Sequence, residues 1–174
     1  MSVFFDTNVL VYAVDRAQPA KRSVAMELLG RHVREHSLVV STQVLQEFYA
    51  VAIRRKLLEP ADALEMVAAL ARAPVVPSSG EFVVRAIALA QRHRLSSWDG
   101  LVVQAALDAR CRILLSEDLG AGTRFGELEV WNPFAPGAHE PAAAATRRTR
   151  TGRGSVSRPR ATAVESSPRA PRRP

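Results

Sequence analysis

Short apolar runs separated by longer helical segments constrain the fold of this chain more than any other feature of its sequence. Residues 3–5, 38–40 and 112–115 form such runs, residues 74–77 form a weaker one, and residues 129–131 are expected to add an edge strand. Strands that are apolar on both faces, with helices between them, are typical of a parallel sheet covered on both sides. The sequence therefore predicts an α/β fold with a short central parallel sheet.

Helices are expected in each interval between these runs. Pro60 suits the first position of a helix, and Ser96 followed by Asp99 forms a capping-box pattern. In open sheets of this kind, ligands bind beyond the carboxyl ends of the strands, so a functional site is expected at that edge. The expected helices cover residues 8–14, 20–35, 42–56, 60–72, 79–94 and 97–110.

Charge divides the chain into two regions. The net charge of +7 comes entirely from residues 135–174, which contain nine arginines and two glutamates, since residues 1–134 contain 15 basic and 15 acidic side chains. Residues 136–174 have almost no large apolar side chains and cannot bury enough surface to offset the entropy of ordering them. We expect residues 1–135 to form one domain and residues 136–174 to form a disordered tail, either a dispensable extension or an arginine arm for phosphates.

Cysteine usage and hydropathy favour a soluble protein of a reducing compartment. Cys111 has no partner for a disulfide and is expected to be a small buried side chain rather than a nucleophile. The first residues lack the basic start and the long apolar stretch of a signal peptide. No window approaches the ~20 apolar residues that span a bilayer. We therefore expect a cytoplasmic location without membrane contact.

Four acidic residues are expected at one edge of the predicted sheet. Asp6 directly follows the first apolar run and Asp118 follows the run at residues 112–115, so both lie at carboxyl ends of strands. Glu47 lies in the second turn of the helix after the second run, and Asp99 lies in the first turn of the helix before the fourth strand. Because parallel strands share one carboxyl edge, all four carboxylates are expected to meet there.

Each of these acids also has a structural explanation. Asp6 is placed to cap a helix, and Asp99 to complete a capping box. Asp118 is placed to form a turn, and Glu47 to pair with Arg54. Together, however, two carboxylates about 4 Å apart repel by about 4 kcal/mol at an effective dielectric constant near ~20, so a cluster of them needs a cation.

A divalent metal ion is the cation that the sequence favours. No lysine or arginine is placed to neutralise all four acids, and oxygen ligands without a thiolate cage favour Mg²⁺ or Mn²⁺. Such an ion lowers the pKa of bound water and assists phosphodiester hydrolysis. The histidines are scattered and show neither ligand spacing nor triad order with a serine. Trp98, beside Asp99, is more consistent with core packing than with stacking on a base.

Four segments resemble the PIN-domain motifs of VapC-type toxins in content and order. They begin at Phe5, Ser41, Trp98 and Leu115, and they read FDTNVLVY, STQVLQEFY, WDGLV and LSEDL. The resemblance covers roughly residues 1–134. One such motif alone is a weak signal, whereas four in this order are specific.

This resemblance implies a PIN-like three-layer sandwich and a Mg²⁺- or Mn²⁺-dependent endoribonuclease, the toxin of a type II toxin–antitoxin pair. It also implies an RNA substrate, a homodimer, and a cognate antitoxin whose C-terminal segment enters the active-site groove. The chain departs from the family pattern at Gly100, where alanine is common, and in its long tail, but neither departure removes an acid. The resemblance implies a metal-binding catalytic site of Asp6, Glu47, Asp99 and Asp118, supported by hydrogen bonds from Asn8 and Ser116.

Three other interpretations stay open. A HAD-like phosphatase would need a second aspartate where this chain has Asn8, and a lysine near the site, yet the only lysines are Lys21 and Lys56. A PIN-like module that binds RNA or a partner without cleaving it is disfavoured by the intact acids. A PIN-domain RNA-processing nuclease without an antitoxin is distinguished from a toxin by gene neighbourhood.

Truncation after Ala135 should leave both folding and RNA cleavage intact, because the removed segment is predicted to contribute no packed core. Thermal unfolding and a cleavage assay of the truncated protein measure this. Loss of the cooperative transition would contradict the predicted domain boundary.

Overall fold

A six-stranded sheet runs through the part of the chain that the structure describes, residues 1–138 of a computed structural model. The strand order is β3-β2-β1-β4-β6-β5, and every pairing is parallel except the one between β5 and β6. The predicted parallel sheet is therefore confirmed. The strands are β1 (Val3–Phe5), β2 (Leu38–Ser41), β3 (Val75–Val76), β4 (Ile113–Leu115), β5 (Arg124–Phe125) and β6 (Leu128–Trp131).

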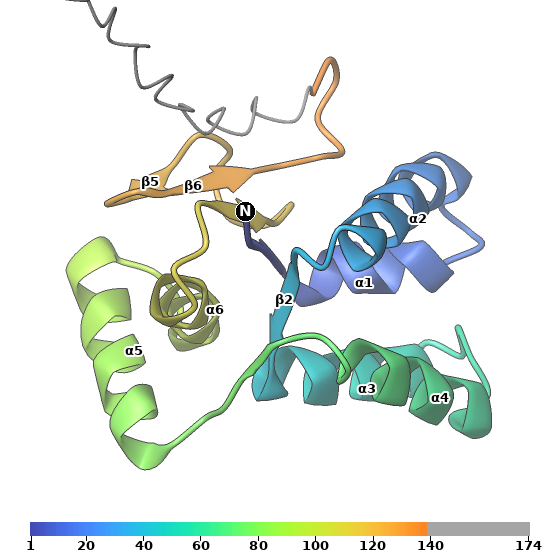
Figure 1. Cartoon of the computed structure of the whole chain (residues 1–174), viewed down its shortest axis with the longest axis horizontal. Coiled ribbons are helices and arrows are strands. Elements are labelled where there is room, and N and C mark those ends of the chain that lie inside the picture. Colours follow the sequence, from blue (N-terminus) through green and yellow to red (C-terminus); the bar gives the residue numbers. More distant parts are fainter. Residues whose placement is uncertain (139–174) are drawn as a thin grey trace, which may run out of the picture. The chain divides into compact units, whose positions relative to one another are not determined.

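Helices cover both faces of this sheet, so the predicted three-layer α/β arrangement is confirmed. Figure 1 shows α1 and α2 on one side of β2 and α5 and α6 on the other. None of the helices within residues 1–138 is long and apolar enough to cross a membrane. The helices are α1 (Thr7–Val14), α2 (Pro19–Arg34), α3 (Thr42–Arg54), α4 (Pro60–Leu70), α5 (Gly80–His93) and α6 (Ser97–Asp108).

The prediction of an edge strand at residues 129–131 is wrong in one respect. β6 occupies these residues but lies between β4 and β5, and the two-residue strand β5 forms the edge. A turn through Gly126, whose φ of 63° suits glycine, lets β5 pair antiparallel with β6. β5 consists of the exposed Arg124 and the buried Phe125 and forms no apolar run, so the sequence does not predict it.

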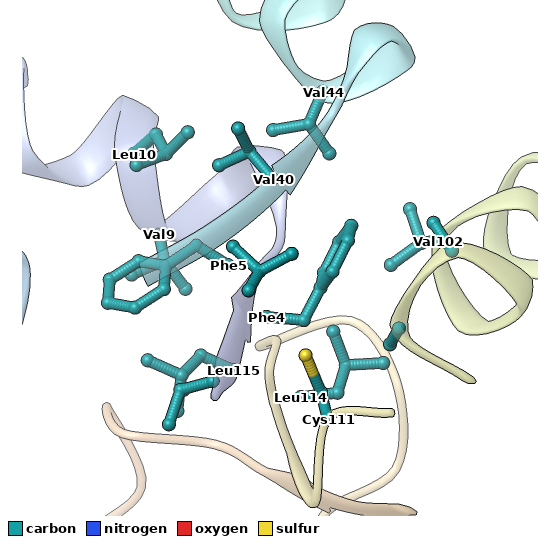
Figure 2. Close-up of a cluster of buried hydrophobic side chains, with 14 of the residues drawn as sticks. Phe4, Phe5, Val9, Leu10, Val40, Val44, Val102, Cys111, Leu114 and Leu115 are labelled. Atoms are coloured by element: carbon teal, nitrogen blue, oxygen red, sulfur yellow. The ribbon is translucent and has the colours of Figure 1, made fainter. Parts of the chain in front are cut away.

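The centre of the core is formed by the neighbouring strands β1 and β4. Phe4, Phe5, Leu114 and Leu115 are fully buried. Figure 2 shows the Phe4 ring extending toward the helix of Val102, and Phe5 also packs edge-on against the His32 ring of α2. The two consecutive phenylalanines thus fill the space on both faces of the sheet, as expected of a strand covered by helices on each side.

Cys111 lies in this core, as predicted. Its side chain is buried and makes no disulfide, and burial raises the pKa of the thiol to about 12. A thiol with so high a pKa carries almost no thiolate near neutral pH, so Cys111 serves as a packed apolar side chain.

The α5–α6 contact explains why glycine stands at position 100. A Cβ at Gly100 would lie 2.7 Å from the backbone oxygen of Ala86 and 2.7 Å from the Cβ of Ala90. Two helices that approach this closely leave no room for a methyl group. The departure from alanine at this position therefore belongs to the packing of α6, the helix that carries Asp99.

Gly100→Ala should destabilise the protein, because relieving two contacts of this kind costs about 1–3 kcal/mol, more than the roughly 1 kcal/mol that alanine gains in helix propensity. Thermal unfolding measures the difference. Gly80→Ala in α5 is the matched control, since a Cβ there meets nothing within 4 Å and should leave the melting temperature unchanged or higher. Equal effects of the two substitutions would contradict the close-packing explanation.

The predicted disorder of residues 136–174 concerns a segment that lies almost wholly outside the described residues. Only residues 136–138 of it are described. The predicted domain boundary at 135 and the role of the tail stay predictions.

Candidate active site

The four predicted acids line one cleft beyond the carboxyl ends of β1 and β4. The cleft has a volume of about 280 Å³, and its walls also include residues of α1, α3 and α6. The last residues of β1 and β4, Phe5 and Leu115, are register partners, and the Asp6 N–H donates to the Leu115 carbonyl oxygen at 3.0 Å. The sheet therefore brings the segments that follow these strands side by side. The acids in the cleft are Asp6, Glu47, Asp99 and Asp118.

Asp6 is held by three hydrogen bonds from uncharged groups. Its Oδ1 accepts from the Thr7 N–H at 2.7 Å, which caps α1. Its Oδ2 accepts from the Ser116 hydroxyl at 2.7 Å and from the Asn8 amide at 3.0 Å. Asp6 thus has the predicted capping role and at the same time keeps its carboxylate in the cleft.

Asn8 joins two of the four carboxylates. Its amide nitrogen donates to Asp6 Oδ2 at 3.0 Å and to Asp118 Oδ2 at 3.2 Å, while its oxygen accepts from the Glu117 N–H at 3.3 Å. The partial positive charge of the amide lies where two negative side chains meet. The structure therefore places Asn8 and Ser116 in contact with the acids that they are predicted to support.

The other two acids are anchored on separate helices. Glu47 Oε2 accepts from the Thr7 hydroxyl at 2.9 Å, so the predicted alternative pairing of Glu47 with Arg54 does not occur. Asp99 Oδ2 accepts from the Ser96 hydroxyl at 2.8 Å, and the Asp99 N–H donates back to the same hydroxyl at 3.1 Å. The predicted N-cap at the start of α6 is confirmed, but the Asp99 carboxylate accepts from the Ser96 hydroxyl and not from the Ser96 N–H as a capping box requires. This pair of hydrogen bonds holds Asp99 at the cleft.

Among residues 1–138, none of the four carboxylates is in an ion pair with lysine or arginine. Lys21, near the cleft, is bound to Glu117 at 2.5 Å and to the Tyr12 hydroxyl at 3.0 Å. Arg55 lines the cleft but binds the buried Asp15 at 2.8 Å. Arg55 was not predicted, because its proximity depends on where α3 ends relative to α1.

Burial raises the pKa of Asp6 from 3.8 to about 6. Hydrogen bonds from Ser116 and from the Thr7 N–H act in the opposite direction, and the charges of Glu47 and Asp118 raise the pKa further. The cleft therefore holds a carboxylate that costs free energy to ionise and that a nearby positive charge would stabilise.

The donor set of the cleft fits a hard divalent cation in its chemistry. Four carboxylates supply only oxygen ligands, which Mg²⁺ and Mn²⁺ prefer. As the side chains stand within residues 1–138, no three acidic, histidine or cysteine groups lie close enough to hold one ion. Glu47 and Asp118 are exposed, and each accepts one hydrogen bond from a neutral side chain, Thr7 and Asn8 respectively.

One buried polar side chain of the cleft has no hydrogen-bond partner among residues 1–138. Gln43, one helical turn before Glu47 on α3, is 7% exposed, and neither its amide nitrogen nor its oxygen has a hydrogen-bond partner in the described part of the chain. An unpaired buried amide costs roughly 1–3 kcal/mol. Retaining one beside the acids is consistent with a site that binds a polar ligand.

Trp98 does not lie in the core, so the favoured interpretation of this residue is wrong. Its side chain is 64% exposed and lines the same cleft as the acids. The helix α6 buries residues that follow Trp98, including Val102 and Val103, against the sheet and α5. Trp98 comes before the first buried residue of that helix, Gly100. Because the sequence of α6 is largely apolar, it does not show that the helix begins with an exposed tryptophan.

A family model described as "PIN domain" matches residues 3–121. No curated protein matches the chain. A chain of a toxin–antitoxin complex from Klebsiella pneumoniae is 19% identical, with a TM-score of 0.55, and the match covers 76% of this chain and 98% of that one.

Two further solved structures are similar at the same level. VapC20 of Mycobacterium tuberculosis, described as a sarcin–ricin loop cleaving toxin, is 18% identical with a TM-score of 0.53, over 65% of this chain and 87% of that one. A chain of VapBC2 from Rickettsia felis, bound to a DNA fragment from its promoter, is 18% identical with a TM-score of 0.54, over 76% of this chain and 100% of that one. At these identities the structural similarities establish the fold alone.

The difference in stability between the metal-free wild type and Asp6→Asn should depend on pH. A group whose pKa is higher in the folded state contributes stability below its unfolded pKa, and that stability is lost as the pH rises through the folded value. In EDTA, the wild type should therefore lose stability relative to Asp6→Asn between about pH 4 and about pH 7. The ceiling is on the order of 3 kcal/mol, because one pKa unit corresponds to about 1.4 kcal/mol.

Denaturant unfolding of both proteins across this pH range tests the prediction. Asp62→Asn is the control, since Asp62 is an exposed aspartate outside the cleft. If the difference between wild type and Asp6→Asn instead grew as the pH fell, the raised pKa of Asp6 would be refuted.

Proposed function

The chain belongs to the PIN domain family, and on this premise we propose that it is a divalent-metal-dependent endoribonuclease, the toxin of a toxin–antitoxin pair. One observation carries the proposal: four carboxylates from four separate segments line one cleft, and no lysine or arginine within residues 1–138 neutralises them. An acidic cleft of this kind repels RNA phosphates unless a cation is present.

Asp6, Glu47, Asp99 and Asp118 would hold the ion, and Mg²⁺ or Mn²⁺ would activate water and offset charge on the phosphate. Asp6 is positioned by the Ser116 hydroxyl and by the Thr7 N–H. The Ser96 hydroxyl orients Asp99, and the Thr7 hydroxyl orients Glu47. These neutral donors fix the direction of each carboxylate without cancelling its charge.

The similar structures support a proposal about the substrate and the partners of this chain. One of them is described as a toxin that cleaves the sarcin–ricin loop, which supports RNA as the substrate class. Two others are toxin–antitoxin complexes, which supports an inhibitory antitoxin as a partner of this chain. We extend the proposal to a homodimer in the cytoplasm.

Co-expression with the product of the adjacent gene, followed by co-purification and assay on total RNA, tests the toxin role.

Glu47→Gln and Asp99→Asn should each abolish metal-dependent RNA cleavage while leaving the fold intact. Loss of a supporting residue typically costs a metal site roughly 10–100-fold, so removal of a carboxylate ligand should exceed that range and Ser116→Ala should fall within it. Cleavage of total RNA with Mn²⁺, Mg²⁺ or EDTA measures these effects, and circular dichroism checks the fold.

Asp62→Asn on α4 is the matched control and should cleave as the wild type does, because this aspartate lies outside the cleft. Full cleavage by either cleft variant would refute the assignment of the site. Cleavage by the wild type that persists in EDTA would refute metal dependence and leave the nuclease activity itself standing.

A further inference from the structure

Trp98 exposes more of its side chain than a tryptophan in a folded domain normally does. It is 64% exposed, and among residues 1–138 its ring stacks on no other aromatic side chain. Removing such an apolar surface from water is favourable by roughly 25 cal/mol per Å². An exposed indole that the fold leaves uncovered is therefore available to a ligand.

The position of Trp98 points to a ligand in the acidic cleft. The indole lines the same cleft as the four acids, and Trp98 directly precedes Asp99 in the first turn of α6. The ring and the Asp99 carboxylate therefore belong to the same wall of the cleft. Gly100 fixes this turn, because α6 packs against α5 at that residue without space for a Cβ.

The charge of the cleft favours a contact of this kind. Residues 1–134 have no net charge, and the one basic side chain among the described residues that line the cleft, Arg55, is bound to Asp15. Phosphate contacts dominate RNA affinity in most proteins, and side chains that could make them are scarce among the described residues that line the cleft. Stacking of a base on an aromatic ring needs no positive charge and tolerates any base.

We propose that Trp98 is the base-binding residue of the cleft, where its indole stacks on a nucleobase of single-stranded RNA next to the phosphate that is cleaved. The inference rests on the proposed function and adds to it the feature of the substrate that this residue recognises. It also implies that the cleaved nucleotides must be unpaired, because a base within a duplex cannot present its face to a protein ring.

The proposal is tested by replacing Trp98 with an apolar side chain that cannot stack and with an aromatic side chain that can. Trp98→Leu should weaken binding of a short oligoadenylate roughly 5- to 150-fold, the equivalent of about 1–3 kcal/mol, whereas Trp98→Phe should retain most of the affinity. Binding is measured with Mn²⁺ in the Glu47→Gln background to keep the RNA intact. In the otherwise native protein, Trp98→Leu should raise KM more than it lowers kcat.

Leu64→Ala is the matched control for loss of an exposed apolar side chain. Leu64 is 62% exposed on α4 and lies outside the cleft, so its replacement should not change RNA affinity. Thermal unfolding of each variant checks the fold. The oligomeric state is measured in parallel, because a Trp98 that contacts a second copy would alter self-association instead of RNA binding.

Fluorescence gives a direct readout of stacking. The chain has two tryptophans, so Trp131→Phe leaves Trp98 as the single indole. Oligoadenylate should quench the emission of Trp131→Phe and leave that of Trp98→Phe unchanged, and an abasic strand of the same length should quench neither.

Equal RNA affinity of wild type and Trp98→Leu, or equal quenching by the abasic strand, would overturn the proposal. So would a change in self-association or in antitoxin binding without a change in RNA affinity, since Trp98 would then serve a protein interface. If the wild type cleaved RNA in these experiments, the nuclease assignment would survive. If the wild type neither bound nor cleaved RNA, the proposed function itself would fail.

Discussion

The contact between the carboxyl ends of β1 and β4 determines the rest of the site. The Asp6 N–H continues the pairing of these strands by donating to the Leu115 carbonyl oxygen, and the Ser116 hydroxyl then donates to the Asp6 carboxylate. Residues 110 positions apart are thereby fixed next to each other. α1 begins at the same point, so Thr7 and Asn8 are directed toward Glu47 and Asp118. The buried Phe4–Phe5 and Leu114–Leu115 pairs anchor this arrangement beneath the cleft.

The acids are separated by neutral donors instead of being neutralised by cations. Hydroxyl and amide groups of Thr7, Asn8 and Ser116 occupy positions where a structural ion pair would have placed arginine or lysine. An ion pair would lower the pKa of Asp6, whereas burial raises it to about 6. The nearby basic residues Lys21 and Arg55 bind other acids. The repulsion among the four carboxylates is therefore not offset by any ion pair within the described part of the chain.

Much of the fold could be predicted from the sequence because its signals are local. Apolar runs, a proline at a helix start and the Ser96 N-cap depend on a few neighbouring residues, and strand order then brings Asp6 and Asp118 to one edge. The rest depends on contacts between distant elements. The two-residue strand β5 exists only by pairing with β6, and Arg55 reaches the cleft through the packing of α3 on α1. The exposure of Trp98 is not predicted, because most later residues of α6 are apolar and many of them are buried.

The Asn8 amide that joins Asp6 to Asp118 also bears on how an ion would bind. A cation that bound directly between Asp6 and Asp118 would replace the two Asn8 hydrogen bonds, whereas the bonds from Ser116 and Thr7 could remain. Its net affinity would be smaller than that of a preformed empty cage by the free energy of the replaced bonds, roughly 1.5–3 kcal/mol for each bond to a charged group. A chain that satisfies its own acids in this way stays folded after it releases the ion. Such a protein would exchange its ion readily with the surrounding solution, so its activity would follow the free concentration of the metal.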